Sequence, residues 1–291
     1  MATFLSEGGF FCAPRCGSLE RYFVPLVWNY QKTTAMKRLL LTLVAMACVA
    51  FAAEARQPLK RTFTSSTGLN LPYQVVYPDD FNPAGRYPLL LFLHGAGERG
   101  NDNELQMTHG GEMLTTAEEL AGVIVVVPQC PEGEWWADID HNLSTRNLLE
   151  MNPAPAITAP MQAVEELLGA LFGLDFVDRE RVYGVGLSMG AMGIWELVCR
   201  HPDLFTAVQP ICGAVNTSVR LAAYEGPTHF RIIHGADDPI VPADCSHKAA
   251  EVLQSNGKPA ELVMFDGCGH LSWNPAFAMS DFLGWMLSKS K

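Results

Sequence analysis

The pentapeptide GLSMG at residues 186–190 is the most informative stretch of this chain, because it has the form G-x-S-x-G between two expected elements. The strand-like run 182–185 precedes it, and a stretch with helical spacing follows it. In this context the chain turns so sharply that the serine adopts strained backbone geometry, and only small residues fit two positions either side. The pattern predicts a nucleophile elbow that sets Ser188 at a helix N-terminus, where free N–H groups favour developing negative charge.

Apolar runs and helical patterns alternate through the rest of the chain, which is typical of β-α-β units with a mostly parallel sheet and helices on both faces. Residues 89–93, for example, form an apolar run without alternation, as expected of a strand buried on both sides. We expect a single α/β domain over residues 56–291. The expected strands are two segments within 60–78, then 89–93, 123–127, 182–185, 206–211, 230–233 and 261–265, and the expected helices are 160–172, 189–199, 243–254 and 277–287.

The N-terminal region has the pattern of a secretory signal peptide over residues 36–55. A basic start, MKR at residues 36–38, precedes an apolar run, and AEA at residues 53–55 supplies the small residues of a cleavage site. A membrane anchor is the alternative, but the apolar run is shorter than the roughly 20 residues of a span. The pattern predicts a secreted or periplasmic protein that begins at Arg56. Residues 1–35 are interpreted as an over-extended reading frame or as an extension without regular structure.

The net charge limits the possible binding partners, and the cysteines indicate which disulfides or metal sites can be expected. The formal net charge of −11 argues against nucleic acid and anionic membrane surfaces as partners. In an exported protein one or two disulfides are expected, in a pairing that the sequence leaves open, and the odd number of cysteines leaves a free thiol. No CxxC pair occurs, which argues against a metal or redox centre. The cysteines after residue 55 are Cys130, Cys199, Cys212, Cys245 and Cys268.

A serine hydroxyl becomes a strong nucleophile only when a neighbouring base takes its proton and a third group, usually a carboxylate, orients that base. In hydrolases with an elbow, these groups follow the serine in the order acid, then base. The acid is expected in HGADDPIVP at residues 234–242, at the carboxyl end of a buried strand, where open α/β sheets bind ligands. Asp238 is our choice because it directly precedes PIVP, and Asp237 is the alternative, better suited to the turn.

The base is expected to be His270. It lies just past the last expected strand, in the glycine-rich stretch DGCGH at residues 266–270. Glycines there let the loop bend back over the elbow, so that the imidazole can reach the serine. His247 also follows the acid loop, but it falls inside an expected helix.

Acyl transfer also needs backbone N–H groups aimed at the charged oxygen of the tetrahedral intermediate. The residue after the nucleophile, Met189, is expected to provide one of them. The loop HGAG at residues 94–97 follows an early strand and is expected to provide the other, from Ala96 or, as second choice, from Gly97.

The residues around these groups have a structural and a functional interpretation. Glu98, Arg99 and residues 101–103 are expected to hold the oxyanion loop through an internal ion pair, with substrate contact as the alternative. A turn is expected at residues 109–111. Three tryptophans are candidates for lining the substrate pocket or for ordinary packing: Trp135, Trp136 and Trp273.

Together these motifs resemble the serine esterases of the α/β-hydrolase fold. The most similar branch contains dienelactone hydrolases, phospholipase/carboxylesterases and polyhydroxybutyrate-depolymerase-like or feruloyl-esterase-like enzymes. The resemblance covers about residues 60–290 and implies Ser188, Asp238 and His270 as the catalytic triad, with no metal and no organic cofactor. The motifs that carry it are LHGAGERG at 93–100 with NDN at 101–103, PQCP at 128–131, GLSMG at 186–190, HGADDPIVP at 234–242 and GHLSW at 269–273.

The residues and the resemblance predict a secreted serine hydrolase that cleaves carboxylic esters through an acyl-enzyme intermediate. The expected substrate is a small-molecule or polymeric ester, and neither nucleic acid nor stable membrane insertion after signal cleavage is expected. Two alternatives stay open: a prolyl-oligopeptidase-like serine peptidase, and a catalytically inactive hydrolase fold that binds ligands. The sequence leaves the acyl group, the alcohol and the oligomeric state undetermined.

Overall fold

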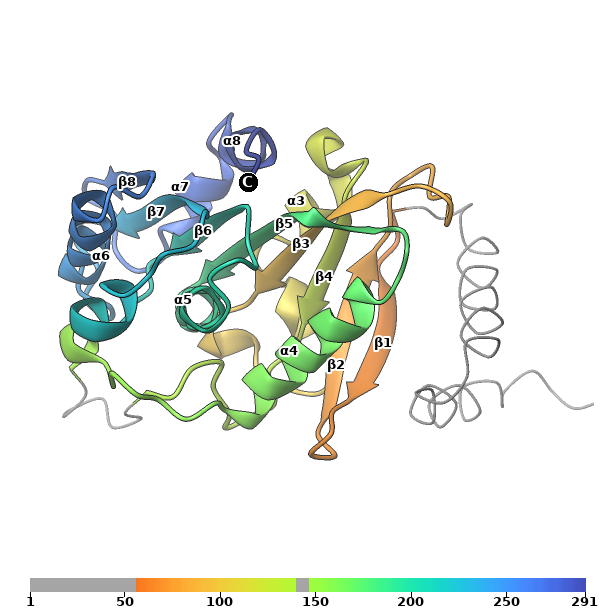
Figure 1. Cartoon of the computed structure of the whole chain (residues 1–291), viewed down its shortest axis with the longest axis horizontal. Coiled ribbons are helices and arrows are strands. Elements are labelled where there is room, and N and C mark those ends of the chain that lie inside the picture. The colour runs from red at the N-terminus through yellow and green to blue at the C-terminus, as the bar shows by residue number, and fades with distance from the viewer. Residues whose placement is uncertain (1–55, 140–146) are drawn as a thin grey trace, which may run out of the picture. The chain divides into compact units, whose positions relative to one another are not determined.

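The computed structural model describes residues 56–139 and 147–291, which build an eight-stranded sheet (Figure 1). The expected signal peptide and the residues before it lie outside the described part. The strand order is β1-β2-β4-β3-β5-β6-β7-β8, and neighbours from β4 to β8 in this order run parallel. β2 runs antiparallel to both β1 and β4. The strands are β1 Leu59–Thr64, β2 Asn70–Val76, β3 Tyr87–Leu93, β4 Ile124–Pro128, β5 Val177–Leu187, β6 Ala207–Ile211, β7 His229–Gly235 and β8 Ala260–Phe265.

The central strands of the sheet are buried on both faces, and β3 shows how the sequence achieves this. Leu89, Leu91 and Leu93 belong to the apolar cluster on one face, and Leu90 and Phe92 belong to the cluster on the other. All of these side chains have 0% exposure. A strand between two helical layers needs apolar residues at every position, which explains why this run shows no alternation. The predicted α/β fold with a mostly parallel sheet is confirmed.

Helices cover the two faces in separate groups (Figure 1). α4, α5 and α6 supply the cluster that contains Leu89, whereas α3, α7 and α8 supply the cluster that contains Leu90. The start of α4 is fixed by Pro160 in its first turn and by the Thr158 side chain, which accepts the Met161 N–H. The longer helices are α3 Gly111–Thr116, α4 Ala159–Phe172, α5 Met189–Arg200, α6 Asp244–Ser255, α7 Trp273–Phe277 and α8 Phe282–Leu287, and the short ones are η2 Ala96–Glu98, η3 Leu105–Met107, η4 Glu118–Leu120, η5 Leu148–Glu150 and η6 Thr217–Leu221.

The predicted C-terminal helix over residues 277–287 is wrong, because two short helices, α7 and α8, take its place. Between them, the carboxylate of Asp281 accepts a hydrogen bond at 2.9 Å from the buried guanidinium of Arg231 on β7. A buried cation needs such a partner, and the contact holds Asp281 outside the helical path. Helical spacing does not reveal this contact, because the two residues are far apart in the sequence.

The predicted disulfides are also wrong for the described residues, whose five cysteines are free thiols. Cys130, Cys212 and Cys245 are buried, and each belongs to a different apolar cluster. The sheet and its helices therefore separate these thiols, and each one packs as a small apolar side chain.

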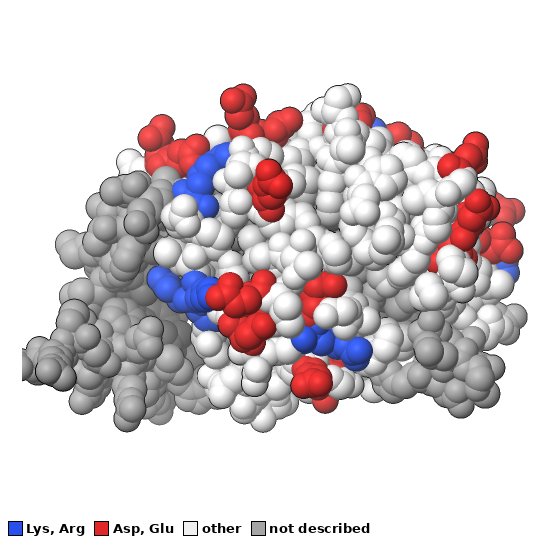
Figure 2. All heavy atoms as spheres, turned by 180° about the vertical axis from the view of Figure 1, so that it is seen from behind, with Lys and Arg blue, Asp and Glu red and all other residues white. Residues whose placement is uncertain are grey.

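On the face shown in Figure 2, the visible Lys and Arg side chains lie beside acidic ones and do not gather into a basic patch. Across residues 56–139 and 147–291, no helix has the length and apolar character that a membrane span requires.

Candidate active site

Ser188 lies at the sharp turn between β5 and α5. Its φ of 52° and ψ of −115° are strained for a residue with a side chain. A Cβ at Gly190 would come within 1.9 Å of the Leu93 carbonyl oxygen, and a Cβ at Gly186 within 2.3 Å of the Gly190 carbonyl oxygen. Packing therefore demands both glycines, and the turn predicted from the G-x-S-x-G pattern is confirmed.

The structure brings the predicted serine, histidine and aspartate into one hydrogen-bonded row. His270 Nδ1 lies 2.7 Å from Asp238 Oδ2, and His270 Nε2 lies 2.8 Å from Ser188 Oγ. An ionised carboxylate only accepts, so Nδ1 carries the imidazole proton and Nε2 is left to accept from the serine hydroxyl. The alternative acid, Asp237, is exposed, and its backbone N–H binds the Cys268 carbonyl oxygen. The geometry therefore places Asp238 in this row.

His270 is not the only group that donates a hydrogen bond to the Asp238 carboxylate. The backbone N–H groups of Ile240 and Val241 donate to Oδ1 at 2.8 and 3.0 Å. Burial opposes ionisation, but hydrogen bonds from His234, His270 and these two N–H groups outweigh it and hold the pKa of Asp238 below its usual range. The carboxylate is thus kept charged and fixed in one orientation.

His234 is a contact of Asp238 that sequence reasoning missed. Its side chain is fully buried, and Nε2 lies 3.2 Å from Asp238 Oδ2 and 3.0 Å from the Val241 carbonyl oxygen. Both neighbours are acceptors, so Nε2 carries a proton that the two share. Ser246 Oγ lies 2.6 Å from the other ring nitrogen, Nδ1. The signal available in the sequence was the histidine directly before Gly235 in the acid motif.

The two predicted oxyanion donors both open a helix. Met189 is the first residue of α5, and Ala96 is the first residue of η2. N–H groups in a first helical turn have no partner within the helix, so these two are available to a ligand. Gly97, the second choice, follows in the same turn and is exposed.

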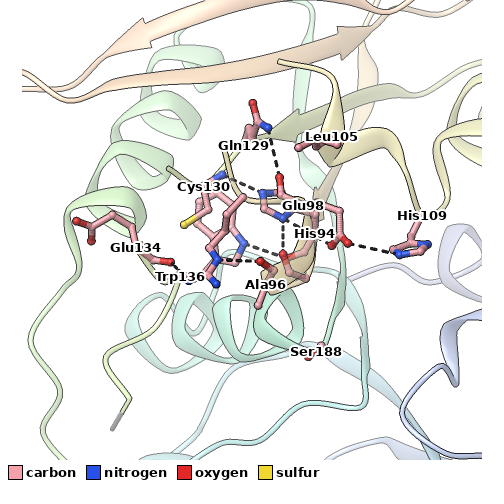
Figure 3. A network of polar contacts seen from close by, with 12 residues as sticks. His94, Ala96, Glu98, Leu105, His109, Gln129, Cys130, Glu134, Trp136 and Ser188 are labelled. Atoms are coloured by element: carbon pink, nitrogen blue, oxygen red, sulfur yellow. Dashed lines mark hydrogen bonds and ion pairs between the residues drawn. The ribbon is translucent and has the colours of Figure 1, made fainter. Parts of the chain in front are cut away.

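The carbonyl groups of this loop are tied to the protein, which fixes the direction of its N–H groups (Figure 3). Trp136 Nε1 donates to the His94 carbonyl oxygen at 3.1 Å. The His94 ring lies 2.6 Å from the Gly95 carbonyl oxygen, and Arg99 Nε donates to the Ala96 carbonyl oxygen at 2.8 Å. The three consecutive carbonyl groups of residues 94–96 are therefore each held by a side-chain donor.

His94 is a neutral imidazole with a defined tautomer. The backbone N–H of Cys130 donates to Nε2 at 2.9 Å, so the ring proton lies on Nδ1 and is donated to the Gly95 carbonyl oxygen. Burial lowers the pKa of His94 to about 4, against the opposing hydrogen bond to Gly95, and the nearby Arg99 cation lowers it further. The ring is thus a fixed support of the loop, and it is uncharged at neutral pH.

Comparison with known proteins agrees with this geometry. A family model described as phospholipase/carboxylesterase matches residues 84–286, well over half of the chain. The chain belongs to the phospholipase/carboxylesterase family.

Individual relatives of this family member include both esterases and a peptidase. NocK of Nocardia uniformis subsp. tsuyamanensis, named as a candidate esterase, is 32% identical over 162 residues, 56% of this chain and 43% of NocK. Dipeptidyl-peptidase 5 of Porphyromonas gingivalis is 23% identical over 270 residues, 78% of this chain and 37% of the peptidase. The crystal structure of a thermostable esterase matches with a TM-score of 0.70 at 29% identity, over 81% of this chain and 64% of that one. The chain thus spans less than half the length of NocK and of dipeptidyl-peptidase 5.

In this family member, the charged residues after the oxyanion loop contact other protein groups. Among the described residues Glu98 forms no ion pair with Arg99, and Glu98 Oε1 instead lies 3.4 Å from His109 Nε2 (Figure 3). Arg99 instead lies over the Trp135 ring, 5.2 Å from its centroid. Asn103 donates its backbone N–H to Gln129 Oε1 at 2.7 Å. These contacts favour the structural interpretation of this segment.

The three predicted pocket tryptophans have different surroundings in this family member. Trp136 is fully buried and supports the oxyanion loop, while Trp135 is half-buried beside Arg99. Trp273 packs edge-on against His270, with 5.6 Å between the ring centroids, and its other neighbour is His109 at 5.2 Å. His109, expected only in a turn, therefore lies between Glu98 and the tryptophan that packs against His270.

Proposed function

We propose that this protein hydrolyses carboxylic esters, with Ser188 as the nucleophile. The observation that carries the proposal is the hydrogen-bonded row of Ser188, His270 and Asp238 at a strained elbow. Beside it lie the backbone N–H groups of Met189 and Ala96, each the first residue of a helix. Membership of the phospholipase/carboxylesterase family and the match to a thermostable esterase support ester bonds as the target.

The geometry supports a two-stage reaction. His270 Nε2 takes the Ser188 hydroxyl proton as Oγ attacks the ester carbonyl carbon, and Asp238 stabilises the imidazolium that forms. The N–H groups of Ala96 and Met189 donate to the oxyanion. The intermediate collapses when His270 protonates the leaving alkoxide, which leaves an acyl group on Ser188. A water molecule, deprotonated by the same nitrogen, then releases the acid and restores the serine.

Peptide bonds are the alternative target of the same residues. The observation in favour is the match to dipeptidyl-peptidase 5 over 78% of this chain. The amine of a peptide bond is a poorer leaving group than the alkoxide of an ester. The rates of ester and anilide hydrolysis therefore separate the two substrate classes.

A hydrolysis profile tests both proposals. We would compare p-nitrophenyl esters of rising chain length, methyl ferulate and an aminoacyl p-nitroanilide, each with the wild-type protein and with Ser188→Ala. The proposal predicts that esters are cleaved faster than the anilide and that Ser188→Ala lowers the rate by on the order of 10⁴-fold or more. Serine-dependent cleavage that favours the anilide would assign the protein to the peptidases. Ester cleavage unchanged in Ser188→Ala would refute the role of Ser188.

We also propose that the protein is exported. Support comes from the sequence alone, in the basic, apolar and small-residue pattern of residues 36–55. Expression of the full chain in a host with a Sec pathway, followed by N-terminal sequencing, tests this. A mature N-terminus at Arg56 is expected, and an uncleaved cytoplasmic product would contradict export.

A further inference from the structure

Cys212 is a second strained residue beside the row of Ser188, His270 and Asp238. It follows β6, the neighbour of the strand that leads to Ser188, and has a φ of 45°. Its backbone N–H donates to the Ile233 carbonyl oxygen at 2.8 Å, just as the Ser188 N–H donates to the Ile211 carbonyl oxygen at 2.8 Å. The thiol has 0% exposure. The reaction described above gives this thiol no role.

The thiol lies among groups that bind metal ions. One ligand atom each from Cys212, Asp238 and His270 lies within 4.8 Å of the others, and no other such group of His, Cys, Asp or Glu occurs in the described residues. Zinc takes sulfur at about 2.3 Å and nitrogen or oxygen at about 2.0–2.2 Å, so its ligand atoms lie about 3.5 Å apart. Movements of about 1 Å would bring these three side chains to that spacing.

The types of ligand atom at this site, one sulfur, one nitrogen and one oxygen, determine which cations it prefers. Thiolate and imidazole favour soft or borderline cations such as Zn²⁺, Cd²⁺ and Co²⁺, whereas Mg²⁺ and Ca²⁺ prefer oxygen ligands alone. His270 is the ligand that reaches solvent, with a side chain 18% exposed, while the Asp238 side chain is fully enclosed.

We propose that Cys212, Asp238 and His270 form an inhibitory site for a thiophilic divalent cation. Binding displaces the thiol proton to solvent and places the metal on Nδ1 of His270, the ring nitrogen that lies 2.7 Å from Asp238 Oδ2. The ring proton then moves to Nε2, which has no lone pair left for the Ser188 proton. The base is thereby lost, so inhibition rests on the proposed function, whereas metal binding does not.

Metal binding at this site releases protons from its ligands, so the cation competes with the hydrogen bond between His270 and Asp238. The proposed site is therefore one for a reversible inhibitor and is distinct from a resident cofactor site.

Metal titration of the purified protein in thiol-free, chelator-free buffer tests the proposal. Zn²⁺ and Cd²⁺ are expected to stop hydrolysis of p-nitrophenyl acetate and Mg²⁺ is not, and EDTA is expected to restore the rate. Cys212→Ala should raise the half-inhibitory Zn²⁺ concentration by about 10-fold or more, each protein being compared with its own metal-free rate. The matched control is Cys268→Ala, which removes another thiol near the row and should keep wild-type sensitivity. Zn²⁺ inhibition that is unchanged in Cys212→Ala would overturn the proposal.

Co²⁺ binding separates the metal site from the reaction. A near-ultraviolet thiolate-to-cobalt charge-transfer band is expected in the wild-type protein, in Cys268→Ala and in the inactive Ser188→Ala. The band should be absent in Cys212→Ala. A band that persists in Cys212→Ala, or no band in the wild-type protein, would refute the site even if Ser188 has another role.

Discussion

The same dipeptide, His-Gly, occurs at the carboxyl ends of two parallel strands and supports two different halves of the candidate site. His94-Gly95 follows β3 and carries the oxyanion loop, while His234-Gly235 ends β7 and carries the acid loop. Both histidines are buried. His94 binds two backbone groups, Cys130 N–H and the Gly95 carbonyl, whereas His234 donates toward the Asp238 carboxylate.

The glycines of the two dipeptides also have related tasks. A Cβ at Gly95 would come within 2.7 Å of Leu187, the residue before the elbow serine. A Cβ at Gly235 would come within 2.2 Å of the Gly269 carbonyl oxygen, directly before His270. In each case the histidine fixes a loop and the glycine admits a neighbouring segment. The comparison suggests that His94 mainly stabilises the fold, and that His234 mainly orients a reacting group.

The largest effect on catalysis is expected from a substitution of Asp238, in the acid loop. Asp238→Asn keeps the size of the side chain but offers an amide in place of the charged acceptor of His270, so kcat should fall by about 10⁴-fold with little change in KM. Steady-state kinetics on a p-nitrophenyl ester measures this. Asp237→Asn is the matched control and should behave as the wild type. Similar losses in both variants would contradict the assignment of the acid.

A loss of protein stability is expected from a substitution of His94, which supports the oxyanion loop. His94→Phe keeps a ring but leaves the Cys130 N–H and the Gly95 carbonyl without partners in a dry interior, at about 1–3 kcal/mol each. We expect the free energy of unfolding to fall by about 2–6 kcal/mol in urea denaturation. A loss below about 0.5 kcal/mol would show that water or a rearranged loop replaces the ring.

Because His94 is buried and neutral, the free energy of unfolding is expected to fall at acidic pH. In the unfolded chain an imidazole takes a proton near pH 6.5, but folded His94 takes one only near pH 4. Between these values the unfolded state binds more protons, so stability is complete above about pH 6.5 and falls as the pH drops toward 4, by about 3 kcal/mol in total. Urea denaturation at several pH values measures this slope. The slope should be shallower in His94→Phe, and equal slopes would contradict the buried neutral ring.

The smallest effect is expected from His234. Its contact with Asp238 is long, at 3.2 Å, and the carboxylate keeps three other hydrogen bonds, from His270, Ile240 and Val241. His234→Leu should therefore lower kcat by about 10-fold and leave KM nearly unchanged. His234→Gln, which retains a donor, should recover part of the rate. Equal losses in kcat for both variants would assign His234 to packing alone.

The sequence predicted the parts of the site that depend on strand ends and chain order. Ser188, Asp238 and His270 each follow a strand of one parallel sheet, so their loops had to meet at one edge. His234, His109 and Cys212 escaped prediction, because their contacts depend on which strands are neighbours and on side-chain direction. The split of the C-terminal helix and the separation of the cysteines have the same origin, since Arg231 and the three apolar clusters are set by tertiary packing.

The most direct test of the central claim is to label the purified protein with a fluorophosphonate and locate the adduct by peptide mass spectrometry. A serine activated by His270 and Asp238 should react once, at Ser188, and Ser188→Ala should remain unlabelled. An adduct on another residue, or none on the folded wild-type protein, would contradict the assignment of Ser188 as the nucleophile.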